Sequence, residues 1–440
     1  MLISPTIDKQ VVGRITMKTI INSKAITKVQ VAMLIAVIAV ASIAAGVAYY
    51  YSTRPSAEEI VIGSVLPLTG TMASIGGYCK NGQDLAVADI NAAGGIQSLG
   101  GAKLKLVEGD LQSDPTLAVT ETERIITTYN PVALIGAYSS SLALPVSTVT
   151  ESHKVPYIAA IAQSINLTNR GYQYVWRQAV NATKSGALPG QFITDMESRT
   201  GTTVETAALV YDNVATFAVQ RLGIINSLNQ MGINIVVDEQ FTTGVSDFTP
   251  VVTKIKVANP DILVSTCYTD DAILLARTIS QMGVHLMAYI TGGAGYQEPD
   301  FFKSAGSASD YVSIQMGWAR DLNLPGLANV VERYEAKYNV IMNEHAGMSY
   351  SGVWILKEVL ELSGTLHPDN PLDPDSIRDA FLKIDITSGL GAMTPGGEVK
   401  FNTQGDNIYA TQVFMQWMNG TQITVWPFKV AAADPVWPRP

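Results

Sequence analysis

The sequence has little cysteine, little histidine and no concentration of basic charge. Its 440 residues include two cysteines and four histidines, which excludes a scaffold held together by disulfide bonds. Lysine and arginine number 29 against 38 aspartates and glutamates, so the net charge is −9. A chain with this balance, and with no basic run beyond its first 28 residues, is a poor candidate for binding nucleic acid.

Several motifs of catalytic and metal sites are also missing. The chain contains no G-x-S-x-G elbow, no Walker A sequence and no G-x-G-x-x-G after an expected strand. No histidine or cysteine has the spacing of a zinc site, and the lone group Asn343-Glu344-His345 is more typical of a helix start. We therefore expect a protein that is not an enzyme and that uses no metal or other cofactor.

The first 51 residues differ in composition from the rest. Five basic residues and one acidic residue precede Val29–Tyr51, a run without Asp, Glu, Lys or Arg. This run is long enough to cross a bilayer as a helix, with its basic flank in the cytoplasm. We therefore expect a membrane anchor with residues 52–440 outside the cytoplasm. A cleaved signal peptide is the alternative, because the small residues of Ala44–Ala48 offer a cleavage site.

From residue 60 onward, short apolar runs alternate with longer amphipathic segments. The expected strands are 60–66, 104–108, 132–135, 157–160, 207–211, 233–237, 262–265, 286–290 and 311–315. The expected helices are 77–92, 115–129, 141–153, 184–198, 214–231, 247–257, 270–282, 326–338 and 345–363. Alternation of this kind is typical of parallel sheets covered on both faces. Since the strands are too many for one small sheet, we predict two doubly wound α/β lobes with a hinge near 180–184.

The loops at the carboxyl ends of these strands are where ligands of open α/β sheets bind. After the strand at 132–135, three serines, Ser139 to Ser141, lead into a helix. Unpaired N–H groups at the helix start, together with serine hydroxyls, suit a carboxylate. The plainer interpretation is that one serine merely caps the helix.

Longer motifs resemble a known family. They are the segments 62–70, 73–76, 86–96, 104–115, 135–141, 167–172 and 211–213. Over about residues 59–430 the chain is similar to branched-chain-amino-acid-type solute-binding proteins, the extracytoplasmic binding components of ABC importers. The resemblance implies a type I periplasmic binding fold, in which two α/β lobes joined by a three-strand hinge close on a small ligand.

The resemblance gives the expected organisation of the chain. It has a basic cytoplasmic leader at 1–28, a transmembrane anchor or signal segment at 29–51, a tether at 52–58, an N-terminal lobe of 59–182 plus about 317–392, a C-terminal lobe of 183–316 plus about 393–430, and a tail at 431–440. The implied partners are a small-molecule ligand, an ABC permease with its ATPase, and the membrane. An alternative is a domain that senses a small amide or carboxylic acid and regulates a partner protein.

The first lobe contributes five residues to the site that the resemblance implies. The family's carboxylate-binding serine falls on Ser140, with Ser139 beside it. Contacts from the next loop fall on Ile161 and Gln163, where the family often has Ala and Thr. An aromatic residue that covers the ligand in the family falls near Ile75.

The second lobe departs further from the family. Its ligand-contacting tyrosine falls on Tyr268, and a covering aromatic residue falls near Thr216 or Phe217. The acidic residue that pairs with the ligand ammonium falls on Ala294. Because an ammonium buried in a cleft needs a carboxylate, we expect a ligand without an ammonium group, unless Asp270-Asp271 replaces the missing acid.

Overall fold

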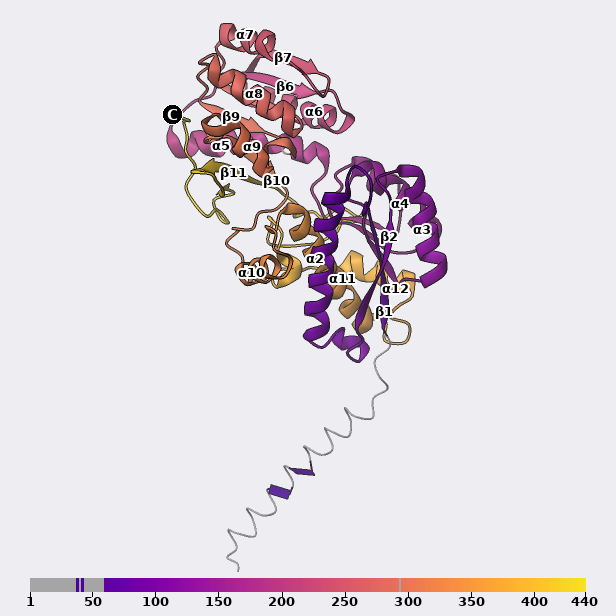
Figure 1. Ribbon diagram of the computed structural model, residues 1–440. Coiled ribbons are helices and arrows are strands. Elements are labelled where there is room, and N and C mark those ends of the chain that lie inside the picture. Colours follow the sequence, from indigo (N-terminus) through magenta and orange to yellow (C-terminus); the bar gives the residue numbers. More distant parts are fainter. Residues whose placement is uncertain (1–36, 39–40, 43–58, 293) are drawn as a thin grey trace, which may run out of the picture. The chain divides into compact units, whose positions relative to one another are not determined.

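Two separate sheets are the framework of the computed structural model (Figure 1). The structure describes residues 37–38, 41–42, 59–292 and 294–440. None of the helices formed by these residues has the length and apolar character needed to cross a membrane. The expected span at 29–51 lies outside the described residues except for four positions, so this structure does not describe it.

The first sheet has five parallel strands in the order β2-β1-β3-β4-β5. They are β1 (Ile60–Leu66), β2 (Leu104–Asp110), β3 (Ala133–Gly136), β4 (Tyr157–Ala159) and β5 (Val175–Arg177). The helices around it are α2 (Ala73–Ala92), α3 (Pro115–Tyr129), α4 (Ser140–Ser152), α10 (Leu327–Tyr338), α11 (Glu344–Leu366) and α12 (Pro374–Lys383). We call this assembly the N-terminal lobe.

Both faces of this sheet are apolar. Val65 and Leu134 pack with the buried side chains of α3 and α4, whereas Ile62 and Ile135 pack with those of α2 and α11. Successive side chains of a strand point to opposite faces. A strand covered by helices on both faces therefore has to be apolar along its whole length.

The second sheet has seven strands in the order β12-β11-β10-β9-β8-β6-β7. Its parallel strands are β6 (Thr206–Asp212), β7 (Asn234–Phe241), β8 (Ile262–Thr266), β9 (Ala288–Thr291) and β10 (Ser313–Met316). At one edge, β11 (Val413–Met418) and β12 (Thr421–Trp426) continue it as an antiparallel hairpin. We call this sheet and its helices the C-terminal lobe.

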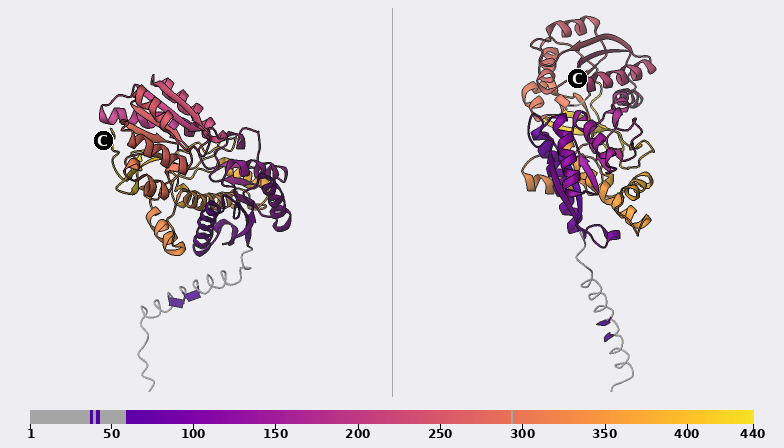
Figure 2. Two further views of the ribbon diagram at one scale, coloured as in Figure 1. Left: turned by 45° about the horizontal axis from the view of Figure 1, so that its top comes forward. Right: turned by 90° about the vertical axis from the view of Figure 1, so that its right-hand side faces the viewer.

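Helices cover both faces of the second sheet as well (Figure 2). One face packs on α5 (Ala182–Thr200) and α6 (Ala215–Gln230). The other packs on α7 (Thr249–Ala258), α8 (Thr269–Gln281) and α9 (Pro299–Ala305). Short 3-10 helices lie at η1 (Gln97–Leu99), η2 (Ile165–Leu167), η3 (Ala294–Tyr296), η4 (Gly306–Ser309) and η5 (Leu390–Ala392).

The chain passes between the two lobes three times. The crossings are 178–181 after β5, 317–326 after β10, and 408–412 before β11. Before the third crossing, the Arg177 N–H donates to Gly405 O at 2.8 Å and the Asn407 N–H donates to Arg177 O at 3.1 Å. Residues 405–407 therefore contact the N-terminal lobe, within the segment of about 393–430 that the sequence assigns to the C-terminal lobe.

Candidate functional site

A sharp backbone turn brings the start of α4 to the carboxyl edge of the first sheet. Gly136, at the end of β3, has a φ of 139°, and a Cβ there would lie 2.2 Å from the carbonyl oxygen of Val65. Ala137 follows with a φ of 48°. Only glycine fits the first of these positions. The turn at Gly136-Ala137 therefore leads the chain from the end of β3 to the three serines, Ser139 to Ser141, at the start of α4.

The adjacent serines make different hydrogen bonds. Ser139 is the cap of α4, since its Oγ accepts from the Leu142 N–H at 3.4 Å. The Oγ of Ser140 accepts from the Ser164 N–H at 3.1 Å. That bond occupies an acceptor position and leaves the Ser140 hydroxyl proton available to a ligand.

The other expected residues of the N-terminal lobe lie near the first crossing or on α2. Ile161 is 9% exposed and belongs to the core. The carbonyl of Gln163 accepts from the Ala182 N–H at 2.9 Å, which ties this loop to the start of α5. Ile75 is half-buried in the first turn of α2 and packs against the same core. The structure thus joins the loops of Ser140 and Gln163, while Ile75 belongs to a separate element.

In the C-terminal lobe, the structure gathers the expected residues around the start of α8. Tyr268 is 46% exposed, and its ring lies 5.3 Å from that of Phe217. The Gly295 N–H donates to Cys267 O at 3.1 Å, which holds η3 and its residue Ala294 beside this loop. Thr216 lies in the first turn of α6. The side chains of Ala294 and Thr216 lie outside the described part of the structure.

Asp271 is hydrogen-bonded to the backbone of a neighbouring loop. Its carboxylate accepts from the backbone N–H groups of Gly244 and Val245 at 3.1 and 3.0 Å, and the side chain is 2% exposed. It is therefore occupied in holding a loop and is not free to replace the acid missing at Ala294. Asp270, next to it, is exposed on the first turn of α8.

A cavity of about 290 Å³ lies where the lobes approach each other. Residues of α2 and of the start of α11 line it from the N-terminal lobe, and residues of β11, β12 and the segment before α9 line it from the C-terminal lobe. The lining residues are Tyr78, Gln297, Glu298, Met316, Trp318, Ala319, Arg320, Ile341, Met342, Asn343, Glu344, His345, Met415, Trp417, Gly420, Thr421 and Gln422.

Sequence reasoning missed the two glutamates of this cavity. Asn343 caps α11 by accepting from the Ala346 N–H at 3.1 Å, so the helix start expected there is confirmed. Glu344 follows with its carboxylate against the backbone of Gly317, where a Cβ would come within 2.4 Å of Oε1. Desolvation, aided by the charge of Glu298, raises the pKa of Glu344 to about 7 despite the Gly317 N–H. The only signal in the sequence was an acid at the start of a long apolar helix.

The remaining ionisable groups of the cavity are also desolvated. Burial raises the pKa of the Glu298 carboxyl above its ordinary value. Burial lowers the pKa of His345 to about 4, so its imidazole is neutral at pH 7. His345 packs edge to face on Tyr138, with ring centroids 5.0 Å apart.

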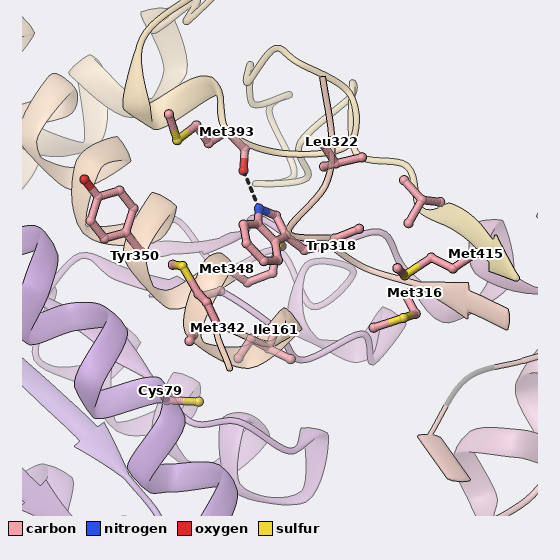
Figure 3. Close-up of a cluster of buried hydrophobic side chains, with 14 of the residues drawn as sticks. Cys79, Ile161, Met316, Trp318, Leu322, Met342, Met348, Tyr350, Met393 and Met415 are labelled. Carbon is pink, nitrogen blue, oxygen red and sulfur yellow. Dashed lines mark hydrogen bonds between the residues drawn. The ribbon is translucent and has the colours of Figure 1, made fainter. Parts of the chain in front are cut away.

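Trp318 and several methionines form the apolar wall of the cavity (Figure 3). The Trp318 Nε1–H donates to Met393 O at 3.0 Å, which fixes the indole in place. Met316 and Met415 lie on one side of the ring and Met342 lies on the other (Figure 3). Methionine side chains are flexible and polarisable, so this wall can adapt to apolar groups of different shape.

A buried polar network links the crossings to the loop of Ala294. The Oε1 of Gln412 accepts from Ser185 Oγ and from Gln315 Nε2, both at 2.6 Å. The Nε2 of Gln220 donates to Ser185 Oγ and to Gly292 O, both at 3.3 Å. These bonds join Gln412 of the third crossing to Gly292, in the loop before η3.

Among the described residues, no three Cys, His, Asp or Glu side chains gather where they could hold a metal ion. Cys79 and Cys267 are both buried and free.

The sequence is similar to a known family of proteins and to individual relatives within the same type. A family model described as "Periplasmic binding protein" matches residues 59–422. Leu/Ile/Val-binding protein homolog 8 of Brucella melitensis is 27% identical over 393 residues, which is 85% of this chain and 92% of that relative.

Solved structures resemble the whole two-lobed part. A branched-chain amino acid transporter substrate-binding protein from Streptococcus pneumoniae, in complex with isoleucine, has a TM-score of 0.67 at 22% identity, covering 83% of this chain and 98% of that one. An ABC transporter solute-binding protein from R. palustris, in complex with benzoate, has a TM-score of 0.65 at 18% identity, covering 86% and 98%.

Proposed function

This chain belongs to the periplasmic binding protein family, and from that premise we propose that it captures a small solute outside the cytoplasm and delivers it to an ABC importer. The match over residues 59–422 confirms the resemblance that the sequence motifs indicate. The observation that supports the proposal most directly is the cavity of about 290 Å³ lined from both lobes, although none of the ligand-contacting residues expected from the sequence lines it. Three crossings are the sole covalent links between those lobes in the described chain.

Capture works as a shift between open and closed arrangements of the lobes. A ligand that touches both lobes does so fully only when they are closed, so it stabilises the closed state by the free energy of the added contacts. The closed form is then the one that a membrane permease and its ATPase recognise. The segment 29–51 anchors the binding domain to the membrane in this proposal.

The ligand is a small amino acid or a related small solute, such as an amide or a small carboxylic acid. Similar proteins are named for leucine, isoleucine and valine, or have been solved with isoleucine or benzoate. In our proposal the Ser140 hydroxyl donates to the ligand carboxylate, beside Ser139. Ile161, Gln163 and Ile75 belong to the side of the N-terminal lobe, while Tyr268 covers the ligand from the other lobe near Ala294 and Thr216.

Thermal-shift measurement on the purified full chain tests the proposal. The panel contains branched-chain amino acids, small amides and simple carboxylic acids. A solute that binds only the folded state raises the melting temperature, and small-angle scattering of the same sample should show a more compact particle. No stabilisation by any member of the panel, and no compaction, would contradict capture of these solutes.

Two exposed tyrosines provide a matched pair of variants. Tyr268→Ala should reduce the ligand-induced shift, because it removes the covering ring from the C-terminal lobe. Tyr129→Ala, at the end of α3, removes a ring of similar exposure, 43% against 46%, away from the site. Equal losses in the two variants would remove Tyr268 from the site.

A further inference from the structure

Building on the proposed function, we propose that the cavity holds the ammonium group of a solute with an aromatic or similarly large apolar body, clamped between Glu298 and Glu344. Glu298 belongs to the C-terminal lobe and Glu344 to the N-terminal lobe, and both line the cavity. The carboxylate of Glu298 or Glu344 can pair with the ligand ammonium in place of the acid that is missing at Ala294. The cavity therefore has carboxylates of its own for an ammonium group, although Ala294 offers none.

Neither glutamate has a cationic partner among the residues that the structure describes. No salt bridge of the described residues involves Glu298 or Glu344, although eighteen others are formed. Arg320 is the single lysine or arginine that lines the cavity, and it pairs with Glu335 at 2.6 Å. A desolvated carboxylate without a cation is costly, so the cavity favours a ligand that supplies one.

His345 provides a second, independent indication of a ligand. The residue lines the cavity, is 4% exposed, and its Nδ1 has no hydrogen-bond partner among the described residues. Buried polar atoms without a partner are rare in folded proteins. A neutral imidazole can accept a hydrogen bond from an ammonium N–H, so His345 adds a third polar contact to those of the two carboxylates.

The walls of the cavity suit an aromatic cation. Trp318 and Trp417 line it, and ammonium groups are attracted to the faces of such rings. An apolar cavity of about 150 Å³ is enough to hold benzene. The volume of about 290 Å³ found here therefore has room for a ring together with a charged substituent. The methionines around Trp318 supply an adaptable contact for that ring (Figure 3).

Because the two carboxylates belong to opposite lobes, a ligand cation bound between them would favour closure of the lobes. In the empty cavity the two negative charges repel each other, which is one cause of the raised pKa of Glu344. A cation between them turns this repulsion into two attractions. The ligand therefore supplies the free-energy difference that favours the closed state.

Binding should release protons below pH 7. The groups that face Glu344 are Glu298, His345, Tyr138, Tyr78 and Arg320. Of these, His345 stays neutral above its pKa of about 4, and Arg320 stays paired with Glu335. A cation prefers the ionised Glu344, whose pKa is about 7, so its affinity should rise about tenfold between pH 6 and pH 8.

The first experiment measures affinity by calorimetry on the purified full chain with matched probes. The pairs are 2-phenylethylamine against 2-phenylethanol, and L-phenylalanine against 3-phenylpropanoate, with leucine as a reference. We expect the ammonium-bearing member of each pair to bind and its partner to bind at least tenfold more weakly. Repeating the titration in buffers of different ionisation enthalpy counts the protons released.

Variants locate the ammonium. Glu344→Gln and Glu298→Gln should each weaken binding of the amine by roughly 30-fold or more, because each removes one partner of a buried charge. Glu344→Gln should also abolish the rise in affinity between pH 6 and pH 8. The control is Glu332→Gln, an exposed glutamate of α10, which should change neither quantity.

The outcomes separate this inference from the proposed function. If leucine or 3-phenylpropanoate binds and the amines do not, capture of a solute stands and the inference is overturned. Amine binding that is unchanged in both glutamate variants overturns it as well. If no compound of either panel binds or compacts the protein, the proposed function itself is contradicted.

Discussion

Ser139 and Ser140 are adjacent in the chain but have different roles. Ser139 caps α4, while Ser140 accepts a hydrogen bond from the Ser164 N–H and keeps its hydroxyl proton for a ligand. We expect Ser140→Ala to weaken binding of a carboxylate ligand by about 1–3 kcal/mol, the usual cost of an unsatisfied buried partner. Calorimetry with L-phenylalanine measures this, and 2-phenylethylamine, which has no carboxylate, should be unaffected. An unchanged affinity for both would place Ser140 outside the site.

Glu344 carries a stability penalty that Glu344→Gln should remove. Its pKa is about 7 in the folded protein against an ordinary 4.5, so the folded state holds a proton that the unfolded state releases between these values. Stability from this group is therefore fully present below pH 4.5 and is lost as the pH rises through 7. At pH 8 the ligand-free variant should be more stable by about 3 kcal/mol.

Urea denaturation at pH 5 and pH 8 checks the prediction for Glu344. The gain should be much smaller at pH 5, where the native carboxyl is protonated. Glu332→Gln, on an exposed position of α10, should show no such difference between the two pH values. Equal effects of Glu344→Gln at both pH values would mean that the side chain is not desolvated. The same variant binds an ammonium ligand less tightly, so stability and capture are opposed at this residue.

At the scale of the element, α11 joins the cavity to the core through one close contact. A Cβ on Gly347 would lie 2.3 Å from the indole of Trp318. Gly347→Ala should therefore destabilise the protein by about 1–3 kcal/mol, as overpacked cores do. Gly77→Ala in α2 is the matched control, because a Cβ there meets nothing within 4 Å. Gly77→Ala should stabilise the helix by about 0.5–1 kcal/mol. Thermal denaturation measures both variants. If Gly347→Ala and Gly77→Ala shift the melting temperature in the same direction, the close contact at Gly347 does not matter for stability.

Elements with strong local signals could be read directly from the sequence. The strand at 60–66 and the helix at 115–129 have their expected bounds. The helix begins after Asp114, whose carboxylate accepts from the Thr116 and Leu117 N–H groups, and ends at Asn130 with a φ of 44°. Capping residues fix such boundaries without help from tertiary contacts.

Some elements were not predicted from the sequence, either because they have no local signal or because their signal was overlooked. β5 is of the first kind: it has three residues, and its pairing with β4 defines it more than its composition does. The hairpin of β11 and β12 had a usable signal, since Asn419 and Gly420 take φ values of 52° and 80° in its turn, as an Asn-Gly pair between apolar runs predicts. α12 begins with Asp373-Pro374, the same start signal as α3. These last two could have been found.

The site was predictable only in outline. The serine loop and the loop of Tyr268 follow strands, so their location at carboxyl edges could be inferred from the alternation of elements. The presence of Glu298 and Glu344 in one cavity could not be inferred, because it depends on how the chain of the second crossing leads from β10 to α11. The raised pKa of Glu344 likewise comes from burial, which a sequence does not display.

At the scale of the whole molecule, one ion pair secures the chain just before the third crossing. Arg177 is 1% exposed and pairs with Asp406, whose Oδ1 also accepts from Thr168 Oγ1 at 2.9 Å. Asp406→Asn should destabilise the protein by about 3–5 kcal/mol, because it leaves a buried guanidinium without its counter-charge. Asp434→Asn breaks the pair with Arg199 at the surface and should change stability little. Urea denaturation that shows equal effects would contradict this role.

Because the chain crosses three times, neither lobe is a continuous piece of sequence. The sheet of the N-terminal lobe ends at Arg177, but α11, which covers one of its faces, ends at Leu366. At ordinary rates of synthesis the interval between them is roughly 10 to 40 s. The C-terminal sheet in turn lacks an edge until β11 and β12 have been made. The growing chain therefore cannot finish either core until it is nearly complete.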